Sequence, residues 1–257
     1  MSLTLSSVYS ADVTPLDLPD AGRLAWWLTA WLRGHVSPDD LVSAVLDGDA
    51  AHHVAGLPGE DDLVPLALSL GALRATGATG AGLALPVEGD LVGLGGPTPF
   101  NSEALEAGEA VVLVDGGAGL VPLRLGRGVV WHWREADRRQ VPDIGEADRL
   151  LRHELIETAN RLATLDVARW RPEVADELIR LHRPAPLVVP PGTPALCADL
   201  AARGLQALAI VDLALADDGA ALTAHEAEQR RTALTGLGRA GRRALVAAGS
   251  PEGWPPS

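Results

Sequence analysis

The chain has 257 residues, of which 47% are hydrophobic and 21% charged, a balance typical of a folded globular protein and not of a disordered one. Its formal net charge of −13 argues against general nucleic-acid binding, because an acidic surface repels the phosphate backbone. The single cysteine, Cys197, excludes an internal disulfide and a cysteine-rich zinc site.

The N-terminal residues 1–13, MSLTLSSVYSADV, lack the basic stretch and long apolar run of a signal peptide. No stretch of the sequence approaches the roughly 20 apolar residues that span a bilayer. We therefore expect a cytoplasmic protein without a membrane partner.

A helix is predicted over residues 20–34, DAGRLAWWLTAWLRG, with Asp20 as its N-cap and Gly34 at its end. This helix is apolar on nearly every side, so it is buried all round or packs against two partners. Left exposed, such a patch would mark an interface, and we expect one in a homo-oligomer. The residues assigned to that interface are Trp26, Trp27 and Trp31.

The next helix begins with Ser37 as N-cap, Pro38 at the first position and aspartates in the first turn. A third helix is predicted over residues 63–74. His52 and His53 follow the end of a predicted helix, and adjacent side chains on a strand would point to opposite faces, which argues against a joint metal site.

From Ala81 the pattern changes to short strands separated by turns, and Asn101 is expected to cap a short helix. The runs EAVVLVD, LVPLRL and VVWHW, separated by GGAG and GRG, predict an antiparallel meander. On the last strand Trp131 and Trp133 share one face and His132 takes the other. The two tryptophans would pack under a helix, or line an apolar pocket with His132 at its rim.

The loop LGGPTPFN has the position of a phosphate-binding loop, after a strand and before a helix. It lacks the GK[ST] and GxGxxG patterns, and Pro97 and Pro99 remove amide donors. A rigid, shaped loop is therefore favoured, with anion binding at Gly95, Gly96 and Asn101 as the alternative.

Beyond residue 142 the sequence is mainly helical, with one long helix over 144–170 and later helices separated by glycines such as Gly204. The tail SPEGWPPS is expected to be poorly ordered. Five arginines near the C-terminus of the last helix favour its dipole and could pair with the acidic N-terminal part, or form a small basic patch for an acidic partner. They are Arg230, Arg231, Arg239, Arg242 and Arg243.

Residues 153–157 read HELIE, one letter from the zinc motif HExxH. On a helical wheel His153, Glu157 and Asn160 lie opposite Leu151 and its apolar neighbours, so a solvated face is favoured over a metal site. If another element covered this face, these three residues would line a polar cleft.

The segments LGGPTPFNSEALEAGEAVV (94–112) and TAHEAEQRRTALTGLGRAGRRALVAA (223–248) resemble those of a group of actinobacterial hypothetical proteins of similar length. The resemblance runs across most of the chain. It implies a bacterial cytoplasmic origin and carries over no catalytic residue.

The sequence thus predicts an α+β fold, in which a helix-and-antiparallel-sheet part (1–142) packs against a helical part (143–257), or the two form one continuous domain. No catalytic, cofactor or metal signature is found. This favours a non-catalytic protein that binds a partner or small ligand. The alternative is a hydrolase with its site in the groove between the two parts, built from His153, Glu157, Asn160 and His132.

Overall fold

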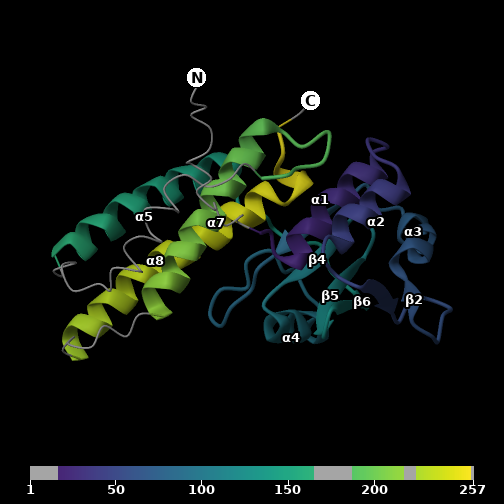
Figure 1. Ribbon diagram of the computed structural model, residues 1–257, viewed down its shortest axis with the longest axis horizontal. Helices are drawn as coiled ribbons and strands as arrows, with labels where there is room; N and C mark the ends of the chain where they lie inside the picture. Colours follow the sequence, from purple (N-terminus) through teal and green to yellow (C-terminus); the bar gives the residue numbers. More distant parts are fainter. Residues whose placement is uncertain (1–16, 165–186, 217–223, 256–257) are drawn as a thin grey trace, which may run out of the picture.

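The computed structural model describes residues 17–164, 187–216 and 224–255, in which a mixed six-stranded sheet lies beside a group of long helices (Figure 1). The fold is α+β as predicted, with the sheet in the N-terminal part and helices in the C-terminal part. The described helices are α1 (Asp20–Leu32), α2 (Pro38–Leu46), α3 (Leu66–Ala75), α4 (Thr98–Ala107), α5 (Ile144–Thr164), α7 (Ala195–Ala216), α8 (Ala224–Ala248) and the 3-10 helix η2 (Pro251–Gly253). Within these ranges, no helix has both the length and the apolar character needed to cross a bilayer.

The sheet has the strand order β2-β1-β6-β5-β4-β3. Its strands are β1 (Ala51–Ala55), β2 (Val64–Pro65), β3 (Gly80–Ala84), β4 (Ala110–Val114), β5 (Ala118–Leu125) and β6 (Gly128–Glu135). β4, β5 and β6 pair antiparallel in succession, which confirms the predicted meander. β1 pairs in parallel with β6, and it places His52 and His53 on a strand that local sequence did not predict.

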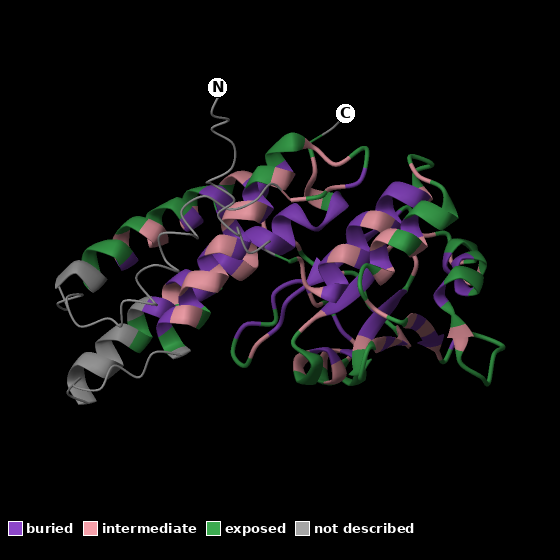
Figure 2. Cartoon of the chain, viewed as in Figure 1, coloured by how far each residue is buried: buried purple, intermediate pink, exposed green. Residues whose placement is uncertain are grey.

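The two faces of the sheet are covered differently. Leu83, Val111 and Trp131 point to the face that packs against α1, α2 and α3, and they belong to the main core. Phe100 of α4 packs with Val121 on the opposite face in a second, smaller cluster. Figure 2 shows buried residues along α1, the central strands and the C-terminal half of α8. Burying each large apolar side chain contributes roughly 1.5–3 kcal/mol.

The tryptophans of α1 are divided between the core and its margin. Trp26 is 1% exposed and Trp31 6% exposed within the single chain, and Trp27 is partly buried against the same core. Asp20 does not cap α1 as expected: the helix begins at Asp20 after Pro19, and the Asp20 carboxylate instead pairs with Arg23. The guanidinium groups of Arg23 and Arg124 bind this carboxylate, which does not bond to the backbone amides of the helix start.

The start of α2 follows the sequence closely. Ser37 Oγ accepts from the Asp40 amide at 3.1 Å, and the Asp40 carboxylate accepts from the Ser37 amide at 3.1 Å. This capping box satisfies two amides that a helix start leaves unbonded, so it makes the boundary local and predictable.

α4 begins earlier than expected, at Thr98, so Asn101 lies inside the helix and does not cap it. The Asn101 Oδ1 atom reaches back to accept from the Gly96 amide at 3.1 Å. Asn101 therefore shapes the loop before α4, and the amide of Gly96 is already occupied.

The expected break at Gly204 is wrong, because α7 continues through it. A Cβ atom at Gly204 would lie 3.1 Å from the Gly241 carbonyl oxygen of α8, and one at Gly241 would lie 3.2 Å from the Gly204 carbonyl oxygen. The two glycines thus let the backbones of α7 and α8 approach closely.

The C-terminal segment is ordered through Pro255, contrary to the expectation for the tail. Pro251–Gly253 forms η2, and the Trp254 indole N–H donates to the Ala248 carbonyl oxygen at 2.9 Å. An aromatic side chain that packs on the core at the chain end offsets the polar and proline-rich composition around it.

Candidate functional site

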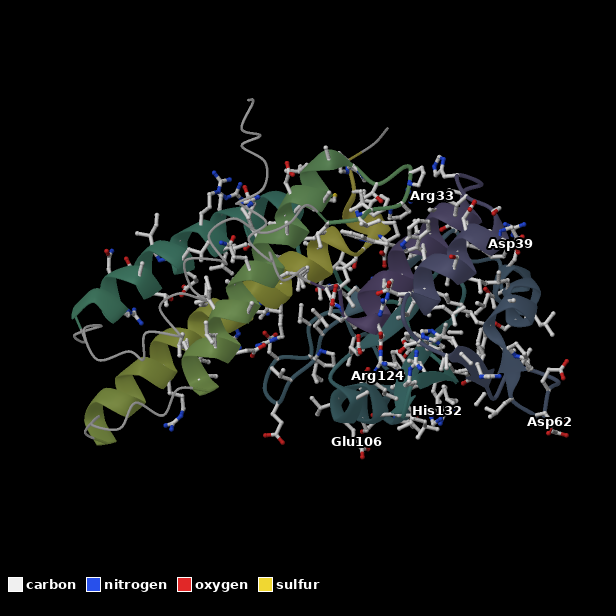
Figure 3. All side chains as sticks on the ribbon, in the orientation of Figure 1. Arg33, Asp39, Asp62, Glu106, Arg124 and His132 are labelled. Carbon is white, nitrogen blue, oxygen red and sulfur yellow. The ribbon has the colours of Figure 1, made fainter. Side chains whose placement is uncertain are left out.

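The HELIE residues do not form a covered cleft in the described structure. His153 and Asn160 are exposed on α5 and Glu157 is half-buried, whereas His132 lies on β6 in the sheet (Figures 1 and 3). No group of three or more metal-ligating side chains occurs among the residues that the structure describes. The hydrolase constellation predicted from sequence is therefore not brought together.

His132 is held by α4 on the outer face of the sheet. Its Nδ1 atom lies 2.6 Å from Glu103 Oε1, and Arg134 Nε donates to Glu103 Oε2 at 2.6 Å. Burial acts to raise the pKa of Glu103, but the bonds from His132 and Arg134 outweigh it and hold that pKa below its ordinary value. These contacts join α4 to β6, which accounts for His132 as a structural residue.

Trp131 and Trp133 lie on the opposite face, against the main core, as the strand alternation predicts. The Trp131 indole N–H donates to His52 Nδ1 at 3.2 Å, and His52 Nε2 lies 2.9 Å from Asp49 Oδ2. Indole nitrogen is only a donor, so His52 Nδ1 must accept and Nε2 must carry the proton toward Asp49. Trp131 therefore fills the core, and Trp133 packs partly buried against it.

Asp49 extends this contact into a charged network at the start of α1. Arg124 bridges Asp49 at 2.8 Å and Asp20 at 2.5 Å. Hydrogen bonds from Arg124 and His52 hold the pKa of Asp49 below its ordinary value. Glu109 lies beside the network and accepts from the Ala21 amide at 2.8 Å. Burial raises the pKa of Glu109 to about 7.

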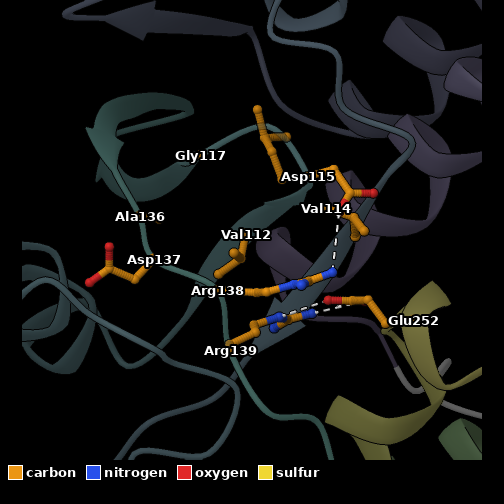
Figure 4. A pocket seen from close by; sticks show the side chains of 10 residues that line it. Val112, Val114, Asp115, Gly117, Ala136, Asp137, Arg138, Arg139 and Glu252 are labelled. Carbon is orange, nitrogen blue, oxygen red and sulfur yellow. Dashed lines mark hydrogen bonds and ion pairs between the residues drawn. The ribbon is translucent and has the colours of Figure 1, made fainter.

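A pocket of about 490 Å³ opens beside the end of β4 (Figure 4). It is lined by Val112, Leu113, Val114, Asp115, Gly117, Ala136, Asp137, Arg138, Arg139 and Glu252. The Gly-rich loop lies behind its wall: Asp137 donates its amide to the Gly96 carbonyl at 2.7 Å, and Gly95 packs against the Arg138 backbone. Gly95, Gly96 and Asn101 thus support this pocket without lining it.

Arg139 is fully engaged in this pocket's wall. Its side chain is 2% exposed and donates to Glu252 and Ser250 and to the carbonyls of Leu83 and Gly93. These bonds join β3 and the following loop to the C-terminal segment. Arg139 therefore acts as a buried structural tie, and its donors are not available to a ligand.

A larger opening of about 670 Å³ lies between α1 and the start of α7. We call it the α1–α7 hollow, and it is lined by Arg33, His35, Gly192, Thr193, Pro194, Pro251, Trp254 and Pro255, with Trp26, Thr29 and Ala30 at its base. The lining comes from three segments that are distant in sequence, and no sequence motif marks Arg33, His35 or Thr193 as part of a site.

The polar groups of the α1–α7 hollow are unusually free. The Arg33 guanidinium lies 5.2 Å from the centre of the Trp254 ring, and no carboxylate of the described residues pairs with it. Thr193 Oγ1 is buried and has no hydrogen-bond partner there. Gly192 has φ +85°, and a Cβ atom on it would lie 2.5 Å from the His35 ring. The glycine therefore lets the loop before α7 close onto His35.

Cys197, in the first turn of α7, is fully buried. Burial raises the pKa of its thiol to about 11, so the thiol stays protonated near neutral pH. It packs as a small apolar residue, as the sequence predicts.

The family models and the curated relatives that match this chain belong to the same protein family. Family models described as the N-terminal and C-terminal domains of Rv1486c-like protein match residues 21–144 and 145–246. Two curated relatives from strains of Mycobacterium tuberculosis, "Uncharacterized protein Rv1486c" and "Uncharacterized protein MT1533", are each 35% identical over 123 residues. Each match covers 38% of this chain and 42% of the relative, so the chain spans less than half the length of these relatives. No solved structure gives a significant match.

Proposed function

This chain belongs to the Rv1486c-like protein family, and for it we propose a non-catalytic binding function, with a small organic anion held in the α1–α7 hollow. The observation that carries the proposal is the state of Arg33. In the described part of a chain with net charge −13, this guanidinium has no carboxylate partner and faces an opening. By contrast, Arg124, Arg134 and Arg139 are each paired with a carboxylate.

The lining of the hollow matches an anion that carries an apolar body. A guanidinium presents a planar fork of N–H donors suited to a carboxylate or phosphate. The Thr193 hydroxyl adds a donor to this lining, and α7 begins at Ala195 close to it, where a helix N-terminus favours negative charge. Trp254 and the prolines supply apolar surface. The volume of about 670 Å³ falls in the range of small-molecule pockets.

Binding is supported over hydrolysis by the groups that line the hollow. Among its described lining residues, His35 supplies the one imidazole, and no carboxylate lies there to orient it. The alternative set of His153, Glu157 and Asn160 lies on α5, apart from His132.

The test is calorimetric titration of the intact protein with a panel of aromatic carboxylates and phosphate monoesters. At least one probe should bind, and Arg33→Gln should weaken it about tenfold or more, since a charge-assisted hydrogen bond contributes roughly 1.5–3 kcal/mol. Arg127→Gln is the matched control, because Arg127 is exposed and donates only to the Gly48 carbonyl among the described residues. Equal binding by Arg33→Gln and the wild type would rule out the assigned site.

A second readout addresses catalysis directly. The same preparations are incubated with 4-nitrophenyl acetate and 4-nitrophenyl phosphate, and no turnover above the buffer is expected. Turnover that His35→Gln abolishes would show that the protein is an enzyme and contradict the non-catalytic part of the proposal.

The homo-oligomer remains a prediction that native mass spectrometry would measure. Trp26 and Trp31 are enclosed by their own chain, so they are not available as an exposed contact surface. If an oligomer forms, Trp26→Phe is expected to leave the number of subunits unchanged.

A further inference from the structure

Three arginines of α8 surround one carboxylate from the N-terminal part. Arg239 Nε lies 3.2 Å from Asp90 Oδ2, Arg243 Nη2 lies 3.0 Å from Asp90 Oδ1, and Arg242 Nη2 lies 4.0 Å from Oδ2. The spacings of three and four residues place the arginines on one face of the helix. We call these three side chains the α8 arginine cluster. Asp90 reaches it from the turn after β3, where it pairs with Val87.

This arrangement matches the sequence interpretation in which the arginines pair with the acidic N-terminal part. The dipole interpretation does not hold, because α8 continues to Ala248 and its last turn carries no basic residue. The pairing is also incomplete. Three guanidinium groups meet one carboxylate, which leaves two positive charges in excess.

Arg242 is the least satisfied member of the cluster. Its Nε atom is buried with no hydrogen-bond partner in the described structure, and its contact with Asp90 is at the limit of an ion pair. Burial lowers the pKa of Arg242, and the charges of Arg239 and Arg243 also lower it, against the attraction of Asp90, which raises it. The fold therefore holds a cation where its own groups do not neutralise it.

An additional anion would stabilise the Arg242 guanidinium, and the α8 arginine cluster is accessible to an anion from solvent. The side chains of Arg239 and Arg243 are 55% and 38% exposed, whereas that of Asp90 is 7% exposed. A ligand can thus approach from the arginine side while Asp90 stays beneath it.

We propose that the α8 arginine cluster is a second binding site, which takes the phosphate group of a ligand. Two excess positive charges match a phosphomonoester, which carries about −1.5 to −2 at neutral pH. Its three peripheral oxygens can accept from several guanidinium forks at once, which a single carboxylate cannot do. Asp90 neutralises one of the three guanidinium charges. A second carboxylate would neutralise one more, whereas a phosphomonoester would neutralise close to both remaining charges.

The first experiment measures the shift in melting temperature on adding inorganic phosphate, with each variant compared with its own phosphate-free state. The wild type should be stabilised. Arg242→Gln should weaken the apparent phosphate affinity about tenfold, whereas Asp90→Asn should strengthen it by a similar factor because it removes the competing carboxylate. Arg242→Lys, which keeps the charge, should retain part of the affinity and guards against a simple folding defect.

A second arm distinguishes a soluble phosphate from a lipid headgroup, by sedimentation with phosphatidylcholine vesicles that contain phosphatidic acid. Sedimentation that is lost in Arg242→Gln would assign the phosphate to a lipid. A response to inorganic phosphate alone would assign a soluble ligand.

The same experiments can overturn the site without touching the proposed function. If Arg33→Gln abolishes the phosphate response and Arg242→Gln does not, phosphate binds in the α1–α7 hollow and the second site is refuted. If neither wild type nor Asp90→Asn responds to phosphate or to the vesicles, the inference fails.

Discussion

Trp26 and Trp254 donate their indole N–H groups to the same carbonyl oxygen, that of Ala248, at 3.2 and 2.9 Å. One tryptophan belongs to the first described helix and the other to the C-terminal segment, and the shared acceptor ends α8. This contact closes the base of the α1–α7 hollow and holds Trp254 where Arg33 lies over its ring. The aromatic wall of the proposed site is thus fixed by the same bonds that join α1 to the end of α8 and to Trp254.

Trp254→Phe should lower the free energy of unfolding by about 1–2 kcal/mol, because it removes a hydrogen bond and weakens the cation–π contact with Arg33. Urea denaturation followed by circular dichroism measures the change. Trp133→Phe is a suitable control, since the Trp133 indole nitrogen makes no hydrogen bond among the described residues and the side chain is likewise partly buried. A smaller effect at Trp254 than at Trp133 would contradict the role of the shared carbonyl.

Arg139→Gln should destabilise the fold by ~3 kcal/mol, because it leaves the Glu252 carboxylate and two carbonyls without their buried partner. Its neighbour Arg138 provides the comparison. The Arg138 side chain is 94% exposed and lies 3.8 Å from Asp115, so Arg138→Gln should change stability by less than about 1 kcal/mol. Equal losses from the two variants, measured by urea denaturation, would show that Arg139 is not the structural tie described above.

Two glycine-to-alanine substitutions should change the free energy of unfolding in opposite directions. Gly204→Ala is expected to destabilise by about 1–3 kcal/mol, since its Cβ atom would lie 3.0 Å from Leu245 Cγ and 3.1 Å from the Gly241 carbonyl. Gly71→Ala on α3 meets no atom within 4 Å and should stabilise by roughly 0.5–1 kcal/mol, because alanine is the better helix former. Thermal melting of both variants checks the prediction, and a stabilised Gly204→Ala would refute the close helix contact.

The stability of the protein should depend on the ionisation of Glu109. Burial raises its pKa in the folded state to about 7, above the ordinary value, so ionisation costs the folded state more than the unfolded one. The cost is absent at acidic pH, grows as pH rises through the ordinary glutamate range, and is complete above about pH 7.

Glu109→Gln removes this cost and keeps an oxygen that can accept from the Ala21 amide. Glu109→Gln should therefore raise the free energy of unfolding by ~2 kcal/mol at pH 8 and change that free energy little at pH 4. Denaturant unfolding across this pH range provides the measurement, with Glu106→Gln on the exposed face of α4 as the control. A pH-independent effect of Glu109→Gln would contradict the assignment.

Local sequence determined those features whose stabilising contacts lie within a few residues of one another along the chain. Ser37 and Asp40 satisfy each other's amides in one helical turn, and the turns between β4, β5 and β6 join strands that are neighbours in both chain and sheet. The opposite faces of Trp131 and His132 follow from strand alternation alone. Acidic charge, one cysteine and the family resemblance could likewise be read directly from the chain.

Tertiary structure decided whatever depends on a partner far along the chain. The parallel pairing of β1 with β6, the passage of α7 through Gly204 and the ordering of Trp254 each require a surface that local sequence does not encode. The proposed site shows the same dependence. Arg33, Thr193 and Trp254 are ordinary residues in their own segments, and only the packing of α1 against the C-terminal part leaves them facing one opening with unused hydrogen-bond donors.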